Sequence, residues 1–113
     1  IDLEQELDEV ERSFRAIAFN QVCLNHGDPC APNFIWSPTR RDVSGCVDLS
    51  GLGFTDLHWD LSIACWSLNY NVKQDVSSLF LAEYTQARRE AGATVQLSAE
   101  TLRQTYRLAR FLL

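Results

Sequence analysis

The segment His26-Gly27-Asp28-Pro29-Cys30-Ala31-Pro32-Asn33 constrains this chain more than any other. It sets a carboxylate, Asp28, and an amide, Asn33, five residues apart on an irregular loop. The apolar residues 22–24 before the loop predict a short buried strand, and residues 34–36 after it predict a second strand. The fold must therefore hold two side chains that carry oxygen on one short, rigid loop between strands.

A second carboxylate follows at the end of a predicted hairpin. Residues 37–42 contain proline and adjacent charged side chains, which predict a turn, and residues 43–49 are an apolar run that includes Asp48. Such a hairpin would return Asp48 to the neighbourhood of Asp28 and Asn33. Oxygen donors of this kind suit Mg²⁺, which takes one or two carboxylates, substrate phosphates and several waters. The sequence therefore predicts a magnesium site with Asp48 as its main carboxylate.

Residues 22–70 resemble the catalytic core of the aminoglycoside phosphotransferase family, which is similar in fold to the eukaryotic protein kinases. The resemblance is carried by the loop 26–33, by Val47-Asp48-Leu49 and by residues 53–62, which read GFTDLHWDLS. The loop is especially similar to that of members that phosphorylate streptomycin or kanamycin-type hydroxyls. In phosphoryl transfer an aspartate orients the attacking hydroxyl and accepts its proton, while an asparagine five positions later holds magnesium on the nucleotide phosphates.

The resemblance implies a role for each residue of the site. Asp28 would be the catalytic base, Asn33 and Asp48 would bind Mg²⁺, and His26 and Asp60 would hold the loop through hydrogen bonds. The implied reaction moves the γ-phosphoryl group of ATP or GTP to a hydroxyl of an aminoglycoside, as in antibiotic resistance. A macrolide, hygromycin, choline or a sugar-like metabolite stays open as the acceptor.

We expect an α+β fold, namely the mostly helical C-terminal lobe of a protein-kinase-like fold with a short β-hairpin that carries the metal site. The whole chain, residues 1–113, is expected to be one unit: a helix over 1–20, the catalytic loop and metal hairpin over 21–56, and a helical substrate subdomain over 57–113. Apolar spacing predicts helices over residues 2–19, 57–71, 75–90 and 98–113, the last with Ser98 as its N-cap. Asp56 and Asp60 also fit a purely structural role as caps of the second helix.

A nucleotide-binding lobe is not visible in the sequence. A kinase needs a cover over the phosphates and a strand lysine before its catalytic loop, but the only lysine, Lys73, follows Asp48. We therefore expect the C-terminal lobe of a longer protein. The competing hypothesis is a non-catalytic kinase-like remnant that binds a partner. The absent lobe favours this remnant hypothesis, and so does Ser50-Gly51, where the family usually has glycine and a basic residue. With serine at position 50, Gly51 and Gly53 would supply the backbone flexibility after Asp48.

The charge balance bears on partners. Fifteen acidic against 10 basic residues give a net charge of -5, which argues against nucleic acid or an anionic membrane and suits a cationic small molecule. No stretch approaches the roughly 18 apolar residues of a transmembrane helix. The substrate-binding residues stay unassigned, with weak candidates at Asp56, Asn69, Glu83 and Glu100. Arg103, Arg107 and Arg110 along the last helix form either a solvated face or a patch for an anionic acceptor.

The four cysteines include no C-x-x-C pair, and no secretory signal is present, so a reduced, cytoplasmic protein is expected. Cys46 and Cys65 lie in apolar runs and are expected in the core. The spacing Cys23-x-x-His26-x-x-x-Cys30 superficially resembles a zinc site. Zinc is the lesser interpretation, because His26 and Cys30 already belong to the loop.

Overall fold

The computed structural model describes residues 2–15 and 21–112, in which it places four α-helices, one short 3-10 helix and four strands. The helices are α1 (Leu3–Arg15), η1 (Ala31–Asn33), α2 (Leu57–Val72), α3 (Ser77–Glu90) and α4 (Ala99–Leu112). The strands are β1 (Val22–Asn25), β2 (Phe34–Ser37), β3 (Asp42–Cys46) and β4 (Gly53–Asp56). They form two separate antiparallel pairs, β1 with β4 and β2 with β3. The expected mixed fold is thereby confirmed at the level of its elements.

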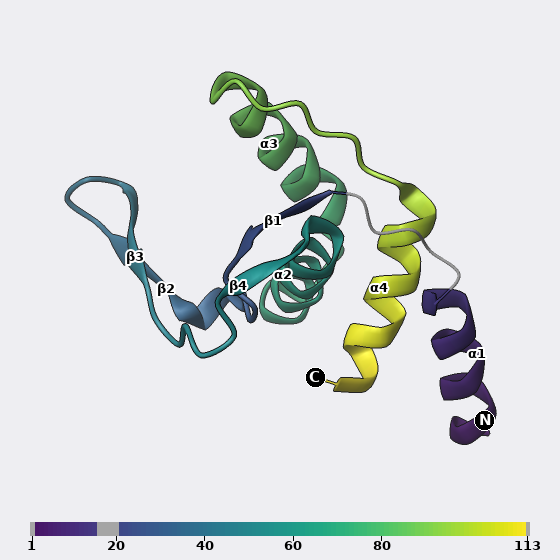
Figure 1. The fold of residues 1–113 in the computed structure, drawn as a ribbon. Helices are drawn as coiled ribbons and strands as arrows, with labels where there is room; N and C mark the ends of the chain where they lie inside the picture. The colour runs from purple at the N-terminus through teal and green to yellow at the C-terminus, as the bar shows by residue number, and fades with distance from the viewer. Residues whose placement is uncertain (1, 16–20, 113) are drawn as a thin grey trace.

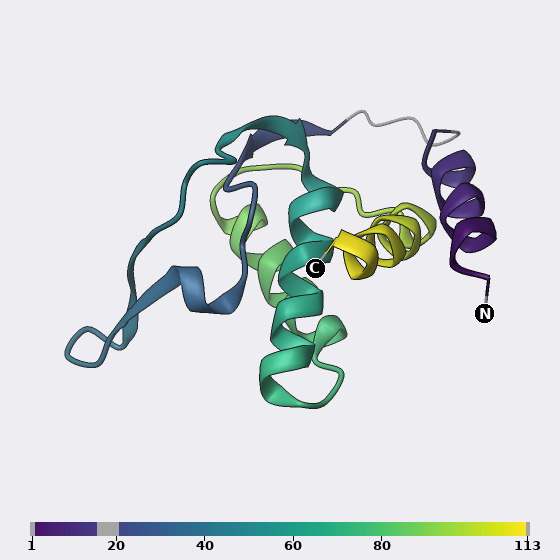
Figure 2. The same ribbon diagram turned by 90° about the horizontal axis from the view of Figure 1, so that it is seen from below.

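Helix α2 is the centre of the molecule. It packs against α3, α4 and the β1–β4 pair, and α1 lies on the outer side of α4 (Figure 1). The β2–β3 hairpin projects away from the helices in both views (Figures 1 and 2). Most of the buried apolar side chains belong to α2, namely Leu57, Leu61, Ile63, Ala64 and Cys65. A helix that is covered on most sides shows no single apolar face, and the heavily apolar sequence of α2 agrees with its central position.

Buried polar contacts join the start of α2 to the start of α4. The imidazole of His58 lies between the carboxylate of Asp56, 2.6 Å from Nδ1, and the N–H of Ser98, which donates to Nε2 at 3.0 Å. Further along, the hydroxyls of Ser62 and Thr105 are hydrogen-bonded to each other. Such groups are buried at low cost because each has a partner. Sequence reasoning did not single out His58, since its partner on α4 lies far along the chain.

The predicted helices over 57–71 and 98–113 are present as α2 and α4, and the predicted end of the latter at 113 lies outside the described residues. Ser98 caps α4 as predicted, because its Oγ accepts the N–H of Thr101 at 3.2 Å. Helix α3 begins at Ser77 rather than at the predicted residue 75, since the Asp75 carboxylate accepts the Ser77 N–H at 3.0 Å in a turn that precedes the helix. The predicted first helix is present over 3–15; its predicted end lies in residues 16–20, outside the described residues.

Two expectations about burial are wrong. The first strand is not buried on both faces, because Val22 is 62% and Leu24 is 59% exposed on one face, whereas Asn25 on the other face is buried. Cys46 lies exposed on the projecting hairpin instead of in the core, whereas Cys65 is buried as expected. No helix in residues 2–15 and 21–112 is both long and apolar enough to cross a membrane.

Candidate active site

The loop over residues 26–33 connects β1 to β2, and its shape is set by local backbone bonds. The N–H of Cys30 donates to the carbonyl of Asp28 at 2.8 Å, which closes a three-residue turn around Pro29. Proline holds a φ angle close to the one that the centre of such a turn needs. The N–H of Asn33 then donates to the carbonyl of Cys30 at 2.9 Å and forms η1. These bonds return Asn33 to the side of Asp28.

Helix α2 holds the loop at two points. The carboxylate of Asp60, which is 9% exposed, accepts the N–H of His26 at 2.9 Å and that of Gly27 at 3.3 Å. Ser67, which is 1% exposed, accepts the N–H of Ala31 at 2.8 Å. Residues seven apart lie on the same face of a helix, so one face of α2 supports the whole loop. Burial raises the pKa of Asp60, while the two backbone hydrogen bonds act in the opposite direction.

Of the two carboxylates at the start of α2, Asp56 is the cap. Its Oδ1 accepts the N–H of His58 at 2.8 Å, as an N-cap side chain does. The capping interpretation of Asp60 is wrong, because its carboxylate binds the loop rather than the first turn of its own helix. Asp60 thus makes hydrogen bonds of the kind expected of a residue that supports the loop.

The raised pKa of Asp60 predicts a pH dependence of stability that Asp60→Asn would remove. Between about pH 4, the unfolded value, and the higher folded value, the folded protein holds more protons than the unfolded one. The free energy of unfolding should therefore fall as pH rises through this window. Urea unfolding of wild type and Asp60→Asn between about pH 3.5 and 6 measures the difference in slope. Equal slopes for the two proteins would contradict the assignment.

The ring of His26 links the loop to the segment that carries Asp48. Nδ1 accepts the N–H of Asp28 at 3.1 Å, and Nε2 lies 2.8 Å from the carbonyl of Val47. Because a backbone N–H only donates and a carbonyl only accepts, Nδ1 is the acceptor nitrogen and Nε2 is the nitrogen that faces an acceptor. His26 therefore connects the backbone of Asp28 to the residue that precedes Asp48.

A further backbone bond joins Val47, the residue before Asp48, to Asn33. The N–H of Val47 donates to the carbonyl of Asn33 at 2.9 Å. The Asn33 side-chain nitrogen donates to the carbonyl of Asp28 at 2.9 Å, so the amide oxygen is the end that can bind a cation. Asp48 is exposed, and its backbone has a φ of 61°, a left-handed conformation that aspartate tolerates better than most residues. The hairpin predicted from the sequence is present, and the metal site that it would carry stays a prediction.

One amide and one carboxylate fit magnesium better than zinc. Mg²⁺ is bound by one or two carboxylates together with phosphate and water oxygens. No group of three or more His, Cys, Asp or Glu side chains in the described part of the chain could hold a metal ion. The oxygen atoms of Asn33 and Asp48 are donors of the kind that Mg²⁺ takes.

The glycines near Asp48 are not in the left-handed region, because neither Gly51 nor Gly53 has a positive φ. The backbone flexibility expected of these two glycines stays a prediction. Gly51 lies against Gly27, whose φ is 94°. A Cβ atom built on Gly27 would lie 2.2 Å from the carbonyl oxygen of Gly51. Gly27 is therefore needed for the close approach of the two segments, and a Cβ atom on Gly51 would be tight, at 3.2 Å from the Cα of Gly27.

The three residues of the apparent zinc motif have other partners. The thiol of Cys30 donates to Asp28 Oδ1 at 3.0 Å, and that of Cys23 donates to Asn25 Oδ1 at 3.5 Å. The two ring nitrogens of His26 have the partners described above. Burial and the bond to Asp28 raise the pKa of Cys30 to about 11, so that the thiol is protonated at neutral pH. Sequence reasoning missed the contact between Cys30 and Asp28.

The weak substrate candidates divide into two groups. Asp56 and Asn69 make structural hydrogen bonds, because Asp56 caps α2 and Asn69 Oδ1 accepts the N–H of Val76 at 2.8 Å. Glu83 and Glu100 are exposed on α3 and α4. None of these bonds identifies an acceptor site, and the substrate-binding residues stay unassigned.

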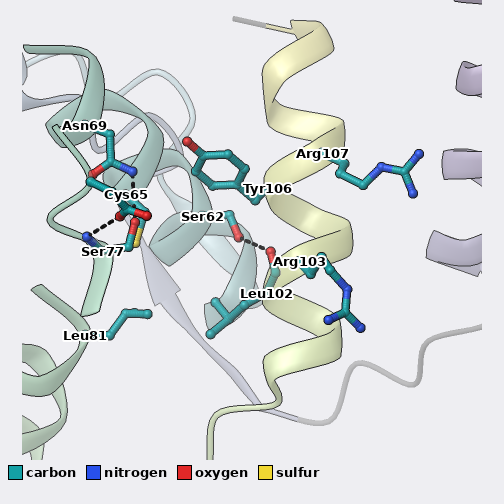
Figure 3. Close-up of a pocket in the computed structure, with 10 residues that line it drawn as sticks. Ser62, Cys65, Asn69, Ser77, Leu81, Leu102, Arg103, Tyr106 and Arg107 are labelled. Carbon is teal, nitrogen blue, oxygen red and sulfur yellow. Dashed lines mark hydrogen bonds between the residues drawn. The ribbon is translucent and has the colours of Figure 1, made fainter. Parts of the chain in front are cut away.

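A pocket of about 310 Å³ lies between α2, α3 and α4 (Figure 3). Arg103 and Arg107 lie at its edge, and Figure 3 shows their side chains extending away from Cys65 and Asn69. Arg107 is 3.8 Å from the carboxylate of Glu6 on α1. This arrangement favours a solvated face with a weak ion pair over an anion-binding patch.

Comparisons with known proteins agree with the resemblance read from the sequence. Residues 2–112 match the family model described as the phosphotransferase enzyme family. The chain is 48% identical over 42 residues to a streptomycin 3''-kinase of Streptomyces griseus, which is 37% of this chain and 15% of the relative. It is 33% identical over 73 residues to a probable aminoglycoside 3'-phosphotransferase of Lactococcus lactis, which is 65% of this chain and 26% of the relative.

Solved structures show the same similarity over nearly the whole chain. An aminoglycoside-3'-phosphotransferase of type VIII superposes with a TM-score of 0.71 at 30% identity, over 95% of this chain and 38% of its own. An aminoglycoside phosphotransferase of Streptomyces rimosus, solved in complex with ADP and streptomycin, superposes with a TM-score of 0.61 at 26% identity. The superposition covers 94% of this chain and 37% of that protein's chain. The present chain thus spans well under half the length of each of these proteins.

Proposed function

Because the chain belongs to the phosphotransferase enzyme family, we propose that the protein transfers the γ-phosphoryl group of a nucleotide to a hydroxyl of an aminoglycoside. The observation that carries the proposal is the geometry of the loop, in which Asn33 bonds to Asp28 and Val47 bonds to Asn33. The names of the relatives support the acceptor class, and the ADP and streptomycin complex of a similar protein supports both ligands.

In this proposal each residue of the predicted site has one role. Asp28 accepts the proton of the attacking hydroxyl and orients it toward the phosphate. Asn33 and Asp48 hold Mg²⁺, which neutralises phosphate charge when bound. His26 and Asp60 keep the loop in place through the hydrogen bonds described above. Most of the rate enhancement then comes from positioning and from charge neutralisation.

The exposed apolar residues support a second lobe that packs on this one. Large side chains stand exposed on the hairpin, on the segment that follows it and on β4, among them Ile35, Trp36, Val43, Leu52 and Phe54. Exposed apolar side chains are typical of an interface where they gather on one side of a molecule. We place a nucleotide-binding lobe over it, with residues 21–56 forming the floor of the nucleotide site and residues 57–113 the substrate side.

The test is ADP release from magnesium-ATP by the protein expressed from its own start codon. Streptomycin, a kanamycin-type aminoglycoside, a macrolide and choline serve as acceptors, and GTP replaces ATP in a parallel series. Release that depends on an aminoglycoside would support the proposal. Release with only the macrolide or choline would show that the acceptor is not an aminoglycoside. No release with any acceptor would favour the non-catalytic binding module.

Asp48→Ala should raise the magnesium concentration needed for half-maximal activity by at least about tenfold, because a charged oxygen donor is removed. Titrating Mg²⁺ at fixed nucleotide measures the shift. Asp42→Ala is the matched control, since Asp42 is an exposed carboxylate on the same hairpin. A magnesium profile that does not change in Asp48→Ala would remove Asp48 from the metal site.

A further inference from the structure

We propose that Cys30 is a positioning residue that orients the Asp28 carboxylate for phosphoryl transfer, an inference that rests on the proposed function. The thiol donates a hydrogen bond to Asp28 Oδ1 at 3.0 Å. Both residues belong to the three-residue turn around Pro29, which keeps their side chains on neighbouring positions of a fixed backbone. The contact is therefore part of the loop's own geometry.

The backbone beside Cys30 is held from the helix below. Ser67 of α2 is 1% exposed, and its hydroxyl accepts the N–H of Ala31 at 2.8 Å. The residue that follows Cys30 is therefore fixed to a buried helix residue, which limits the movement of the thiol relative to Asp28.

The thiol contact leaves the two carboxylate oxygens of Asp28 with different partners. Oδ1 receives the thiol at 3.0 Å, whereas Oδ2 has a longer contact of 3.4 Å with the side-chain nitrogen of Asn33. A carboxylate that is bonded at one oxygen presents the other to the acceptor hydroxyl. Without the thiol the carboxylate torsion is less restricted, since this torsion is broad, and proton transfer depends on alignment. Cys30 therefore acts through Asp28 and does not touch the substrate.

The kinetic test compares Cys30→Ala with Cys30→Ser in the protein expressed from its own start codon. Cys30→Ala should lower kcat about 5- to 30-fold, with KM for nucleotide unchanged, because one hydrogen bond to a charged group is lost. Cys30→Ser keeps an O–H donor and should restore kcat to within about threefold of wild type. Asp8→Ala is the control, since that carboxylate is exposed on α1 and the variant should match wild type.

A second measurement reports the contact without activity. The difference infrared spectrum of wild type minus Cys30→Ser isolates the S–H stretch of Cys30. That band should move to higher frequency in Asp28→Ala, because the thiol loses its strong acceptor. A band that does not move, a Cys30→Ala protein with wild-type kcat, or a Cys30→Ser protein as slow as Cys30→Ala would each overturn the positioning role alone. A wild type with no acceptor-dependent ADP release would overturn the proposed function, and this inference with it.

Discussion

Asp28→Ala should abolish acceptor-dependent phosphoryl transfer and leave the fold intact. Removing a general base lowers kcat by about 10²- to 10⁴-fold. The Asp28 side chain bonds only to neighbours on its own loop among the hydrogen bonds described, namely Cys30 and Asn33. The free energy of unfolding should therefore change by less than about 1 kcal/mol. Initial rates of ADP release at saturating acceptor, together with a urea unfolding curve, measure both quantities.

The control for Asp28→Ala is Asp8→Ala, which removes an exposed carboxylate from α1. It should keep wild-type rates and stability. An Asp28→Ala protein that releases ADP at the wild-type rate would show that another group accepts the proton, and the assignment of the loop as catalytic would then be wrong.

Gly27→Ala should lower both stability and activity, because the backbone of Gly27 is left-handed and lies against Gly51. The φ of Gly27 is 94°, and a Cβ atom there would overlap the Gly51 carbonyl oxygen at 2.2 Å. A left-handed conformation costs an alanine about 1–2 kcal/mol, and forced overlap costs about 1–3 kcal/mol more. The free energy of unfolding should fall by about 2–5 kcal/mol in total. Because the N–H of Gly27 donates to Asp60, the shift would also displace the loop.

Two other glycines separate the causes of this loss. Gly92 has a φ of 84°, and a Cβ atom added there would meet nothing within 4 Å, so Gly92→Ala should show the backbone cost of about 1–2 kcal/mol alone. Gly45 has no positive φ and open space where a Cβ atom would lie, so Gly45→Ala should be close to neutral. Urea unfolding of the three variants gives the ranking. If Gly27→Ala proved no more costly than Gly92→Ala, the close approach to Gly51 would not matter.

The two substitutions should behave differently in experiment. Asp28→Ala removes a chemical group from a loop that keeps its shape, so rate and stability should separate. Gly27→Ala changes the shape of that loop, so rate and stability should fall together. Measuring both variants therefore distinguishes the chemistry proposed for the loop from the packing that supports it.

Local patterns in the sequence determined the parts of the fold whose signals lie close together along the chain. The loop 26–33 could be identified from its own residues, and α4 from its apolar spacing and its Ser98 cap. The β2–β3 hairpin followed from a turn between two apolar runs. Each of these elements is stabilised by contacts between residues that are near neighbours in sequence, which is why a pattern could predict it.

Only the tertiary structure decided which groups meet across long stretches of chain. The resemblance implied that Asp60 supports the loop, but its partner came only from the structure, in which the carboxylate reaches the N–H of His26, 34 residues earlier, instead of capping its own helix. Gly51 packs on Gly27, and Ser67 supports the loop from α2, although no periodicity marks these pairs. Burial also depended on tertiary packing. Val22 and Leu24 on one face of β1 are exposed, because no described element covers that face. The sequence alone named the residues of the loop, whereas the packing of α2 beneath it fixed their geometry, because hydrogen bonds and close contacts depend on distance in space.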